Sequence, residues 1–489
     1  MHIDEVKFMI GLLTLKNTRK RMHTGRERYR MVDQSQIQSI LQEALKNGGD
    51  FAELFFEERD DTNICCRNGI VDGVQTKHIY GVGLYLLNGT KSVYTYSNNT
   101  SYAALLSLAE KASQMLRMQD GQRNSKGIVL QEQQYHNPNV IVEYPSSVSY
   151  QDKIRIVTQA YRNAKSAGPV LIDADMNYFD ADRRITIANS DGLLTRDRRV
   201  TSRLRMGITC GDETGSFYHW EDYTRPQGFE AFRNSEEYLA FAKELVVRCE
   251  NMRTAKTMKP GVMPVVLAAG ACGTLWHESC GHTLEATAIA SRNSCFVDKI
   301  GKKIASDKVT LIDDGTMPGY YGTDAIDDEG HVKQKNVLIE KGILKSYLCD
   351  RLHGRMIGME STGSGRRENY SYAPVSRMTN TYLAAGEDDE EEIIRSVPEG
   401  LFVKSLGGGF GGMQFSIEVK EGFLIKNGQI DRQIKGIMLT GNGAEVINKI
   451  DRVGKTVGFD AGGFCGAASG LVPVTSMQPM VRISEMSLG

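Results

Sequence analysis

Apolar and polar residues recur along this chain with two different periods, and these periods predict its helices and strands. A period of three to four residues predicts helices at residues 35–45, 101–115, 150–167 and 235–251. Alternation with a period of two, broken by glycine-containing turns, predicts short strands at residues 51–56, 64–67, 73–76, 81–87, 171–179, 184–189 and 204–209. Strands also dominate the second half, at residues 338–347, 422–427 and 435–439. We therefore expect an α+β fold.

The order of these elements predicts two domains. Residues 35–228 are expected to form an N-terminal α+β domain, with an antiparallel sheet covered on one face by two long helices. Residues 229–489 are expected to form a strand-rich C-terminal domain that carries the candidate metal-binding helix described below. Residues 1–34 place an apolar stretch before a basic cluster, which is the reverse of the order in a secretory signal. We predict a disordered or non-native extension there, with Met31 as a candidate native start.

Composition narrows the classes of function. Of the 489 residues, 40% are hydrophobic and 24% are charged, which is ordinary for a soluble globular protein. The 59 Lys and Arg residues nearly balance the 60 Asp and Glu residues, so no global field attracts nucleic acid or an acidic membrane. No apolar run approaches the roughly twenty residues of a membrane-spanning helix. The nine cysteines lack paired spacing, as is typical of a reducing compartment, and we expect a cytoplasmic location.

The most informative motif is His277-Glu278-Ser279-Cys280-Gly281-His282. Two histidines and a glutamate supply metal ligands and a base together, but the histidines are five residues apart instead of the four of the common H-E-x-x-H helix. Five residues of a regular α-helix turn about 500°, which leaves the two rings about 140° apart. A local π-bulge returns them to nearly one face. Gly281 is where such a distortion costs least.

The surroundings of the motif favour a site over a chance combination of residues. Residues 265–270 predict a buried strand ending in glycine, and residues 274–289 predict a helix that follows it. The motif therefore opens a helix at the end of a strand, a usual place for a site. The alternative interpretation is that His277 and His282 are unrelated helix residues and that Glu278 is a solvated charge.

Four blocks of the second half resemble one protein family. They are residues 277–285, 327–330 (Asp-Asp-Glu-Gly), the two segments 365–370 and 377–382, and 463–466 (Gly-Phe-Cys-Gly). Together they are similar to the TldD/TldE (PmbA) family of cytoplasmic metallopeptidases, and the intact H-E-x-x-x-H resembles the metal-bearing TldD side. The resemblance covers residues 35–489. The segment 407–416 departs from the family pattern because it is shorter.

The resemblance implies that His277 and His282 bind zinc (Zn2+), that Glu278 is the catalytic base and that Cys465 is the third ligand. Zinc chemistry agrees, because a catalytic zinc site keeps three protein ligands and one open position, and mixed His and Cys sets are known. The Gly-Gly-Phe-Cys-Gly setting of Cys465 also lets backbone approach a crowded site.

Five further residues have more than one interpretation. Glu285 and Cys280, each three residues from a histidine of the motif, are alternative third ligands. Arg366 and Arg367 have two interpretations. They form a guanidinium clamp for a peptide carbonyl or a carboxylate, or they are surface charges or structural ion-pair partners of nearby acidic residues. Asn380 lies in an alternating Thr-Asn-Thr-Tyr segment and faces either a substrate cleft or the core.

The leading hypothesis is zinc-dependent hydrolysis of peptide bonds. The family implies unfolded or leader-bearing peptides as substrates, enclosed in a chamber that this chain forms with a TldE-like (PmbA-like) partner or with a second copy of itself. Such peptides can bind by adding a strand to an exposed sheet edge. The main alternative is a non-catalytic scaffold or regulatory subunit, against which the intact motif argues. Modulation of DNA topology is a third hypothesis, disfavoured by the near-zero net charge and by the lack of a basic reading helix.

Overall fold

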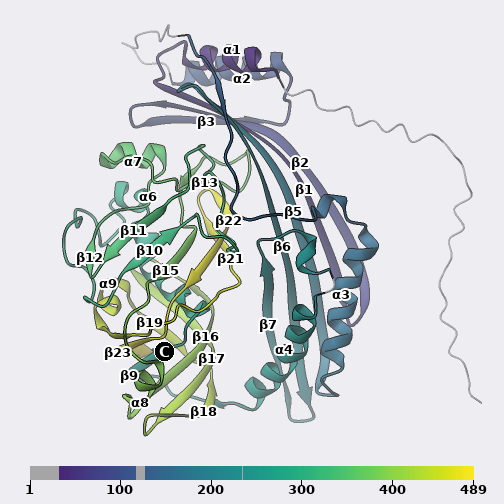
Figure 1. Ribbon diagram of the computed structural model, residues 1–489, viewed down its shortest axis with the longest axis vertical. Coiled ribbons are helices and arrows are strands. Elements are labelled where there is room, and N and C mark those ends of the chain that lie inside the picture. Colours follow the sequence, from purple (N-terminus) through teal and green to yellow (C-terminus); the bar gives the residue numbers. More distant parts are fainter. Residues whose placement is uncertain (1–31, 117–126, 234) are drawn as a thin grey trace, which may run out of the picture.

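Two halves of the molecule lie against each other in the computed structural model, which describes residues 32–116, 127–233 and 235–489. Figure 1 shows a long curved sheet with helices along its outer side and a β-rich body against its inner side. The α+β class expected from the sequence is confirmed. Most of the expected extension at residues 1–34 lies outside the described residues. Within the described ranges, no helix is long and apolar enough to cross a membrane.

The first half is built on one sheet of seven strands. Their order is β3-β2-β1-β5-β6-β4, with β7 also paired to β6, and every pairing except that of β4 is antiparallel. The strands are β1 (Phe51–Arg67), β2 (Ile70–Asn88), β3 (Lys91–Ser97), β4 (Gln131–Gln133), β5 (Leu171–Asn189), β6 (Leu193–Asp212) and β7 (Gly215–Arg225). The helices are α1 (Gln34–Leu45), α2 (Tyr102–Met115), α3 (Tyr150–Lys165) and α4 (Glu237–Thr254), with 3-10 turns at Pro145–Ser147 and Phe229–Ala231.

The strands of this sheet are longer than the sequence pattern predicts. The segments predicted as two strands each within β1 and within β5 are continuous strands of 17 and 19 residues. Charged residues interrupt the apolar pattern in the middle of both strands, but they pair with each other across the sheet. Arg183 donates to Glu57 at 2.8 Å and Arg184 donates to Asp60 at 2.7 Å. Such cross-strand pairs stabilise strand residues that apolar alternation does not mark.

Two pairs of helices cover the outer face of the sheet, one pair near each end (Figure 1). Helices α1 and α2 pack on one end, and α3 and α4 pack on the other. Helix α4 was expected in the second domain, but its buried residues Tyr238 and Leu245 belong to the same apolar cluster as Ile156 of α3 and Tyr178 of β5. The first half therefore extends to the end of α4, past the boundary expected at residue 228.

The second half is built on a closed barrel and is strand-rich, as expected. Strands β16, β9, β23, β19 and β17 are hydrogen-bonded in this order, and β17 pairs back with β16. Strands β18, β8 and β20 extend the barrel sheet, a second sheet has the order β12-β11-β10-β15-β22-β21, and β13 pairs with β14.

The elements of the second half are short compared with those of the first. The strands are β8 (Lys256–Thr257), β9 (Gly261–Leu267), β10 (Leu311–Asp314), β11 (Lys335–Glu340), β12 (Ile343–Leu344), β13 (Gly365–Arg366), β14 (Val375–Ser376), β15 (Asn380–Leu383), β16 (Glu399–Phe410), β17 (Gln414–Lys426), β18 (Gln429–Lys435), β19 (Met438–Asn442), β20 (Ile450–Val453), β21 (Gly463–Ala467), β22 (Gly470–Met477) and β23 (Val481–Leu488). The α-helices are α5 (Thr274–Trp276), α6 (Ala286–Ala290), α7 (Arg351–Ile357), α8 (Glu390–Arg395) and α9 (Gly443–Val446).

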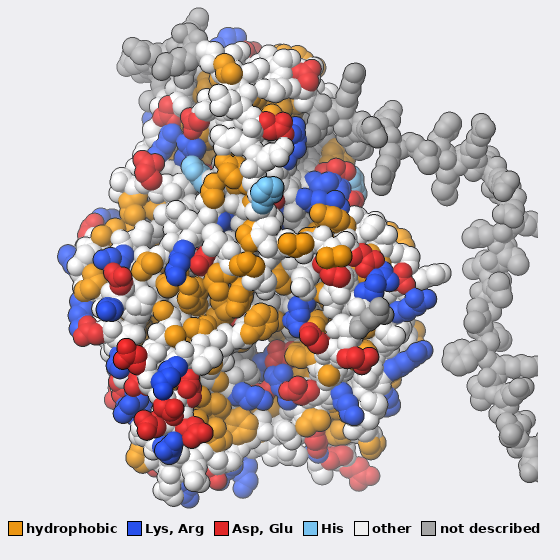
Figure 2. Space-filling view, viewed as in Figure 1, with side chains coloured by type: hydrophobic (Ala, Val, Ile, Leu, Met, Phe, Trp, Pro, Cys, Tyr) orange, Lys and Arg blue, Asp and Glu red, His pale blue; other side chains and the backbone are white. Residues whose placement is uncertain are grey.

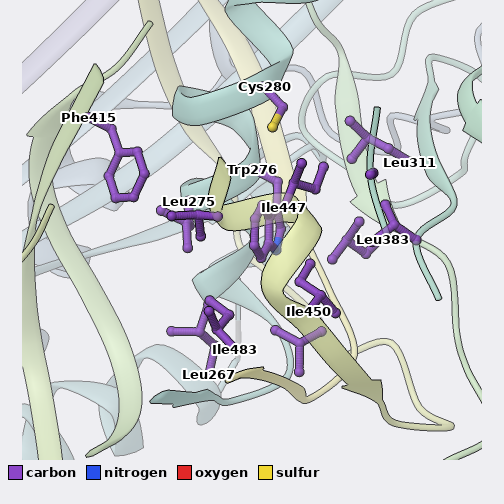
Figure 3. Close-up of a cluster of buried hydrophobic side chains, with 14 of the residues drawn as sticks. Leu267, Leu275, Trp276, Cys280, Leu311, Leu383, Phe415, Ile447, Ile450 and Ile483 are labelled. Atoms are coloured by element: carbon purple, nitrogen blue, oxygen red, sulfur yellow. The ribbon is translucent and has the colours of Figure 1, made fainter. Parts of the chain in front are cut away.

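The helical turn that precedes the metal motif is anchored in the main core of this half. Trp276 is 1% exposed and lies among Ile447, Ile450 and Leu383, as Figure 3 shows. Its indole nitrogen donates to Gln478 Oε1 at 2.5 Å, so the one polar atom of this buried side chain has a partner. Because Trp276 is held in the core, the backbone position of the next residue, His277, is fixed as well.

A buried ion pair joins the two halves. Arg367 of the second half donates to Glu53 of β1 at 2.6 Å, and both side chains are fully buried. Arg367 also donates to the carbonyl oxygen of Asp328 at 2.8 Å, and its guanidinium lies 4.4 Å from the ring centroid of Phe55. Odd-numbered residues of β1 face this interface because neighbouring side chains of a strand point to opposite sides.

The substitution Arg367→Met tests this interface. It leaves the Glu53 carboxylate buried and unpaired, so we expect the free energy of unfolding to fall by about 3–5 kcal/mol. Denaturant unfolding followed by circular dichroism measures the change. The matched control is Arg395→Met, which removes an exposed pair with Glu391 and should cost no more than about 1 kcal/mol. Equal, small losses in both variants would show that the buried pair does not hold the halves together.

Candidate metal centre

The metal motif lies on a π-helical turn. The π-helix spans His277–Gly281, between α5 and a 3-10 turn at His282–Leu284. The π-bulge that the five-residue spacing predicts is thus present in the structure. The continuous helix expected at residues 274–289 is not, because Glu285 is extended (φ −73°, ψ 133°) and its neighbours bond to the backbone of Leu348. The chain turns away there before α6 begins.

Glycines from other segments let the chain pack closely on the π-turn. A Cβ on Gly443 would lie 2.0 Å from the carbonyl oxygen of Ser279, and one on Gly411 would lie 2.3 Å from that of Glu278. A Cβ on Gly281 itself would lie 2.0 Å from Met378 Sδ. The amide of Gly412 donates to the carbonyl of Glu278 at 2.9 Å, which satisfies one of the carbonyls that the π-turn exposes.

Three side chains converge beside this turn. The ring centroids of His277 and His282 are 4.9 Å apart, with their planes nearly perpendicular at 84°. Cys465 reaches the same place from β21, and its Sγ lies 3.3 Å from His282 Nε2. One donor atom from each of the three residues lies within 4.8 Å of the other two. The structure therefore brings together the three ligands expected from the sequence.

These donors fit a single metal ion such as zinc. Ligand atoms sit about 2.0–2.3 Å from zinc, which places them roughly 3.3–3.8 Å from one another around a tetrahedron. His277 Nδ1 is buried and has no hydrogen-bond partner within the described residues, so this nitrogen is available to bind a metal ion. Burial raises the pKa of the Cys465 thiol, but the two adjacent histidines lower it to about 4. The thiolate is the form of cysteine that binds metal.

The two alternative third ligands have other contacts. Glu285 Oε2 lies 3.2 Å from His282 Nδ1, so Glu285 holds the ring nitrogen that faces away from Cys465. Burial lowers the pKa of His282, but Glu285 and Cys465 raise it well above its ordinary value. Cys280 is fully buried in the core, with its sulfur near Ser279. Glu285 is thus placed to orient a ligand, a role that the sequence analysis did not assign to it.

Glu278 lies at the open side of the centre. Its carboxylate is 3.9 Å from His282 Nε2, and its side chain is 24% exposed. The side chain therefore reaches both the space between the donors and the solvent. This is the position that a base needs if it is to act on a water molecule held at that point.

Arg377 holds the hairpin that brings Cys465 into place. Its guanidinium is fully buried and donates to the carbonyl oxygens of Cys465 at 2.5 Å and Gly470 at 2.8 Å. It also donates to Ser469 Oγ at 3.0 Å. These bonds span both strands of the β21–β22 hairpin. Arg377 belongs to one of the blocks that resemble the family, but nothing local in the sequence shows which distant carbonyl oxygens a buried arginine binds.

The expected substrate contacts are placed differently from one another. Arg366 is 3% exposed, lines an interior cavity and donates to the carbonyl oxygen of Met378 at 2.7 Å. Arg367 forms the interface pair described above. Asn380 is fully buried, and its amide bonds to Gly322, Asp314 and Thr323. The geometry favours a structural role for Arg367 and Asn380, and substrate contact stays a prediction for Arg366.

A second group of potential ligands is already neutralised. His219 and Glu221 of β7 lie beside Glu421 of β17, with donor atoms within 4.8 Å of one another. Arg248 contacts both carboxylates, and Lys420 lies 3.2 Å from Glu221. Burial and Lys420 lower the pKa of His219 to about 4. These cations repel a metal ion, so the group is an ion-pair cluster between the two halves.

Comparison with known proteins assigns the chain to a class. Models of the PmbA/TldA metallopeptidases match three parts of it: domain 1 at residues 52–116, the central domain at residues 143–253 and the C-terminal domain at residues 260–489. The end of the central domain agrees with the packing of α4 on the first half. These matches place the chain in a class of metallopeptidases, and enzymes of this class need a metal ion.

Relatives that align along most of the chain identify the family. A metalloprotease TldD homolog of Haemophilus influenzae is 32% identical over 453 residues, which cover 90% of this chain and 93% of that protein. A TldD homolog of Buchnera aphidicola from Acyrthosiphon pisum is 32% identical over 460 residues, covering 92% and 94%. The chain therefore belongs to the PmbA/TldD family of metallopeptidases.

Solved structures confirm the fold. A protein of Thermotoga maritima described as a modulator of a DNA gyrase superposes with a TM-score of 0.74 at 18% identity, covering 93% of this chain and 99% of that one. TldE of Thermococcus kodakarensis superposes with a TM-score of 0.69 at 17% identity, covering 93% and 100%. At this level of identity the likeness establishes the fold alone.

The substitution Gly443→Ala tests the packing of the π-turn. Gly443 lies in α9, where alanine would otherwise stabilise the helix by about 1 kcal/mol. Its Cβ would meet the backbone of Ser279, so we expect instead a loss of about 1–3 kcal/mol and weaker metal binding. Thermal unfolding and zinc titration measure both effects. Gly408→Ala is the control, because nothing lies within 4 Å of its Cβ. A stabilised Gly443→Ala protein with unchanged metal affinity would contradict this account.

Substitutions at three acidic or thiol side chains rank their contributions to metal binding. Cys465→Ser replaces a thiolate ligand by a poor donor and should leave the purified protein with little zinc. Glu285→Gln should weaken metal affinity by about 10–100-fold, as is typical when a residue behind a ligand is changed. Cys280→Ala should retain zinc. Metal content by mass spectrometry and competition with a chelator give the ranking. Full zinc occupancy in Cys465→Ser together with loss of zinc in Glu285→Gln would show that Glu285, and not Cys465, is the third ligand.

Proposed function

We propose that this chain is a zinc-dependent peptidase of the H-E-x-x-x-H type. The observation that carries the proposal is the convergence of His277, His282 and Cys465 with Glu278 at the open side of the group. Two imidazoles and a thiolate suit zinc, and the Saccharolobus solfataricus relative bears the name zinc metalloprotease TldD homolog, at 29% identity over 252 residues. When bound, zinc polarises the scissile carbonyl and lowers the pKa of a coordinated water.

The protein's own residues supply the proton transfers and the positioning. Glu278 accepts a proton from the attacking water and passes it to the leaving amine, because it is the one carboxylate of the motif that reaches the open side. Glu285 fixes the orientation of the His282 ring through Nδ1. Arg377 fixes the backbone of Cys465. His282 and Cys465 are therefore each held in place by a partner of their own.

A free sheet edge leads to this centre and suits an extended peptide. Strand β16 pairs with β9 only as far as Val403. Beyond it, β16 has β17 on one side and, within the described residues, no strand on the other. The loop after β16 reaches the π-turn, where Gly412 bonds to Glu278. A peptide added to this edge would approach Glu278 through backbone contacts, which read sequence weakly.

The substrate class follows from this mode of binding. A peptide that adds a strand must be unfolded there, so we assign unfolded or leader-bearing peptides as substrates. Arg366 would bind a peptide carbonyl or carboxylate. Enclosure needs a second subunit, either a TldE-like (PmbA-like) paralogue or a second copy of this chain. TldE of Thermococcus kodakarensis shares the fold, which supports pairing between similar shapes. We place this activity in the cytoplasm, in keeping with the unpaired cysteines.

A non-catalytic scaffold subunit is the second candidate. It would need neither a donor set nor a base, whereas this chain carries both, with the glycine contacts that shape the π-turn around them. Zinc content together with peptide hydrolysis by the purified protein, tested alone and with its paralogue, separates the two candidates.

The substitution Glu278→Gln tests the base. The amide keeps the shape of the side chain but cannot accept the proton, so turnover should fall at least about 100-fold while zinc content stays full. Peptide cleavage followed by mass spectrometry measures the rate. The control is Glu445→Gln, which changes an exposed carboxylate on α9. Near-normal turnover in Glu278→Gln would exclude it as the base.

Selection of unfolded chains can be tested with one sequence in two states. A destabilised domain should be cleaved at least about tenfold faster than the same domain locked by a disulfide, because only the former can present an extended segment. Addition of the TldE-like paralogue should raise the rate above that of either chain alone. Equal rates on both forms of the domain would refute selection by unfolding.

A further inference from the structure

A cavity lies between the two halves, and its lining includes none of the three candidate metal ligands His277, His282 and Cys465. Its volume is about 520 Å³, within the range of small-molecule sites. Residues of the long sheet, including Phe179 and Arg203, form one wall, and residues of the second half, including Tyr321, Arg366 and Phe464, form the other. Figure 2 shows that the surface is hollowed between the halves and that charged side chains gather there.

Most arginines in the wall of this cavity have carboxylate partners. Arg205 makes two hydrogen bonds to Asp222, at 2.9 and 2.7 Å. Arg199 donates to Asp328 at 2.6 Å and lies 3.3 Å from Asp324. These pairs neutralise each other and leave little charge for a ligand.

Arg203 and Arg366 are exceptions. Within the described residues, Arg203 makes no hydrogen bond to a carboxylate, and its nearest acidic oxygen is that of Asp222 at 3.6 Å, which Arg205 already occupies. Among the described residues, the Arg366 side chain donates one hydrogen bond, to the carbonyl oxygen of Met378. A guanidinium has five donors. Both guanidinium groups therefore contribute N–H donors without partners in the described part of the chain, and positive charge, to the wall of one cavity.

Apolar rings lie beside these donors. The Arg203 guanidinium is 5.1 Å from the ring centroid of Phe464 and 5.7 Å from that of Phe179. Tyr321 meets Phe464 edge to face, with centroids 5.6 Å apart. A ligand that satisfies the whole cavity thus combines an anionic group with an apolar body.

We infer that this cavity binds a small organic carboxylate, its charged end on Arg203 and Arg366 and its apolar body against Phe464 and Tyr321. The planar fork of a guanidinium matches a carboxylate in two hydrogen bonds. The ligand is either the carboxyl end of a peptide or a free carboxylic acid, which share this chemistry.

The cavity shares a structural wall with the metal centre. Phe464 and Cys465 are neighbours on β21, and successive side chains of a strand point to opposite faces. A ligand packed on Phe464 therefore restricts the strand that carries the metal's cysteine. Binding in the cavity and binding of zinc are linked, and the linkage must be reciprocal.

Calorimetric titration with 3-phenylpropionate tests the site, with 3-phenylpropanamide as the uncharged match. The zinc-loaded protein should bind the acid at least tenfold more tightly than the amide, and inorganic phosphate, which lacks the apolar body, should bind more weakly than the acid. Arg203→Gln should weaken binding of the acid at least tenfold. The control is Arg196→Gln, an arginine on the same strand that is half exposed and paired with Glu132, and it should change nothing. Equal binding of acid and amide, or no binding, overturns the inference.

The same titration on protein stripped of zinc excludes direct coordination to the metal. The inference is supported if the acid still binds without zinc, with a changed affinity, and if Arg203→Gln weakens that binding. It is overturned if binding requires zinc and is unchanged by Arg203→Gln. If Arg203→Gln does not fold, Arg203→Lys and Phe464→Leu take its place, and both should weaken binding. A short apolar peptide and its C-terminally amidated form then identify the source. Preference for the free carboxyl terminus assigns a peptide end, and equal weak binding of both assigns a free acid.

Discussion

The rest of the structure depends on one constraint, the separation of two histidines by five residues. A regular helix would point the rings apart, so the chain must adopt a π-turn at His277–Gly281, and one π-turn by itself is less stable than α-helix. Contacts with the surrounding segments offset this lower stability. Trp276 anchors the start of the turn in the core, and Gly411 and Gly443 allow other backbone segments to pack closely against the turn. The distortion is held by the whole core of the second half rather than by the motif.

The long sheet of the first half has a different task, which is to present one ordered face to the second half. Strands of 17 to 20 residues carry apolar side chains to the helices on one side and charged side chains to the interface on the other. The charges are buried but mostly paired, as Glu53 is with Arg367. A polar interface of this kind fixes relative position more strictly than an apolar one, because each misplaced pair leaves a buried charge.

Sequence reasoning succeeded where the signal was local. The hypothesis that two histidines five residues apart bind one ion predicted the π-turn, and apolar periodicity located α1 to α4 to within a few residues. It failed where tertiary partners decide. Charged stretches in β1 and β5 are strand because of partners on neighbouring strands. The fold, not the sequence, shows that α4 faces the first half, that Glu285 turns its carboxylate to His282 and that Arg377 serves Cys465. Cys465 was predicted as the third ligand from the family resemblance, because 183 positions separate it from His282.

That separation sets the order in which the three donors can come together. During synthesis the motif leaves the ribosome long before β21, and its barrel stays open until β23 inserts between β9 and β19 near the C-terminal end. A nascent chain therefore holds two histidines without their cysteine and without the wall that shapes the π-turn. A partly made chain therefore cannot assemble the three donors, and β23 closes the barrel only after β21 has supplied Cys465.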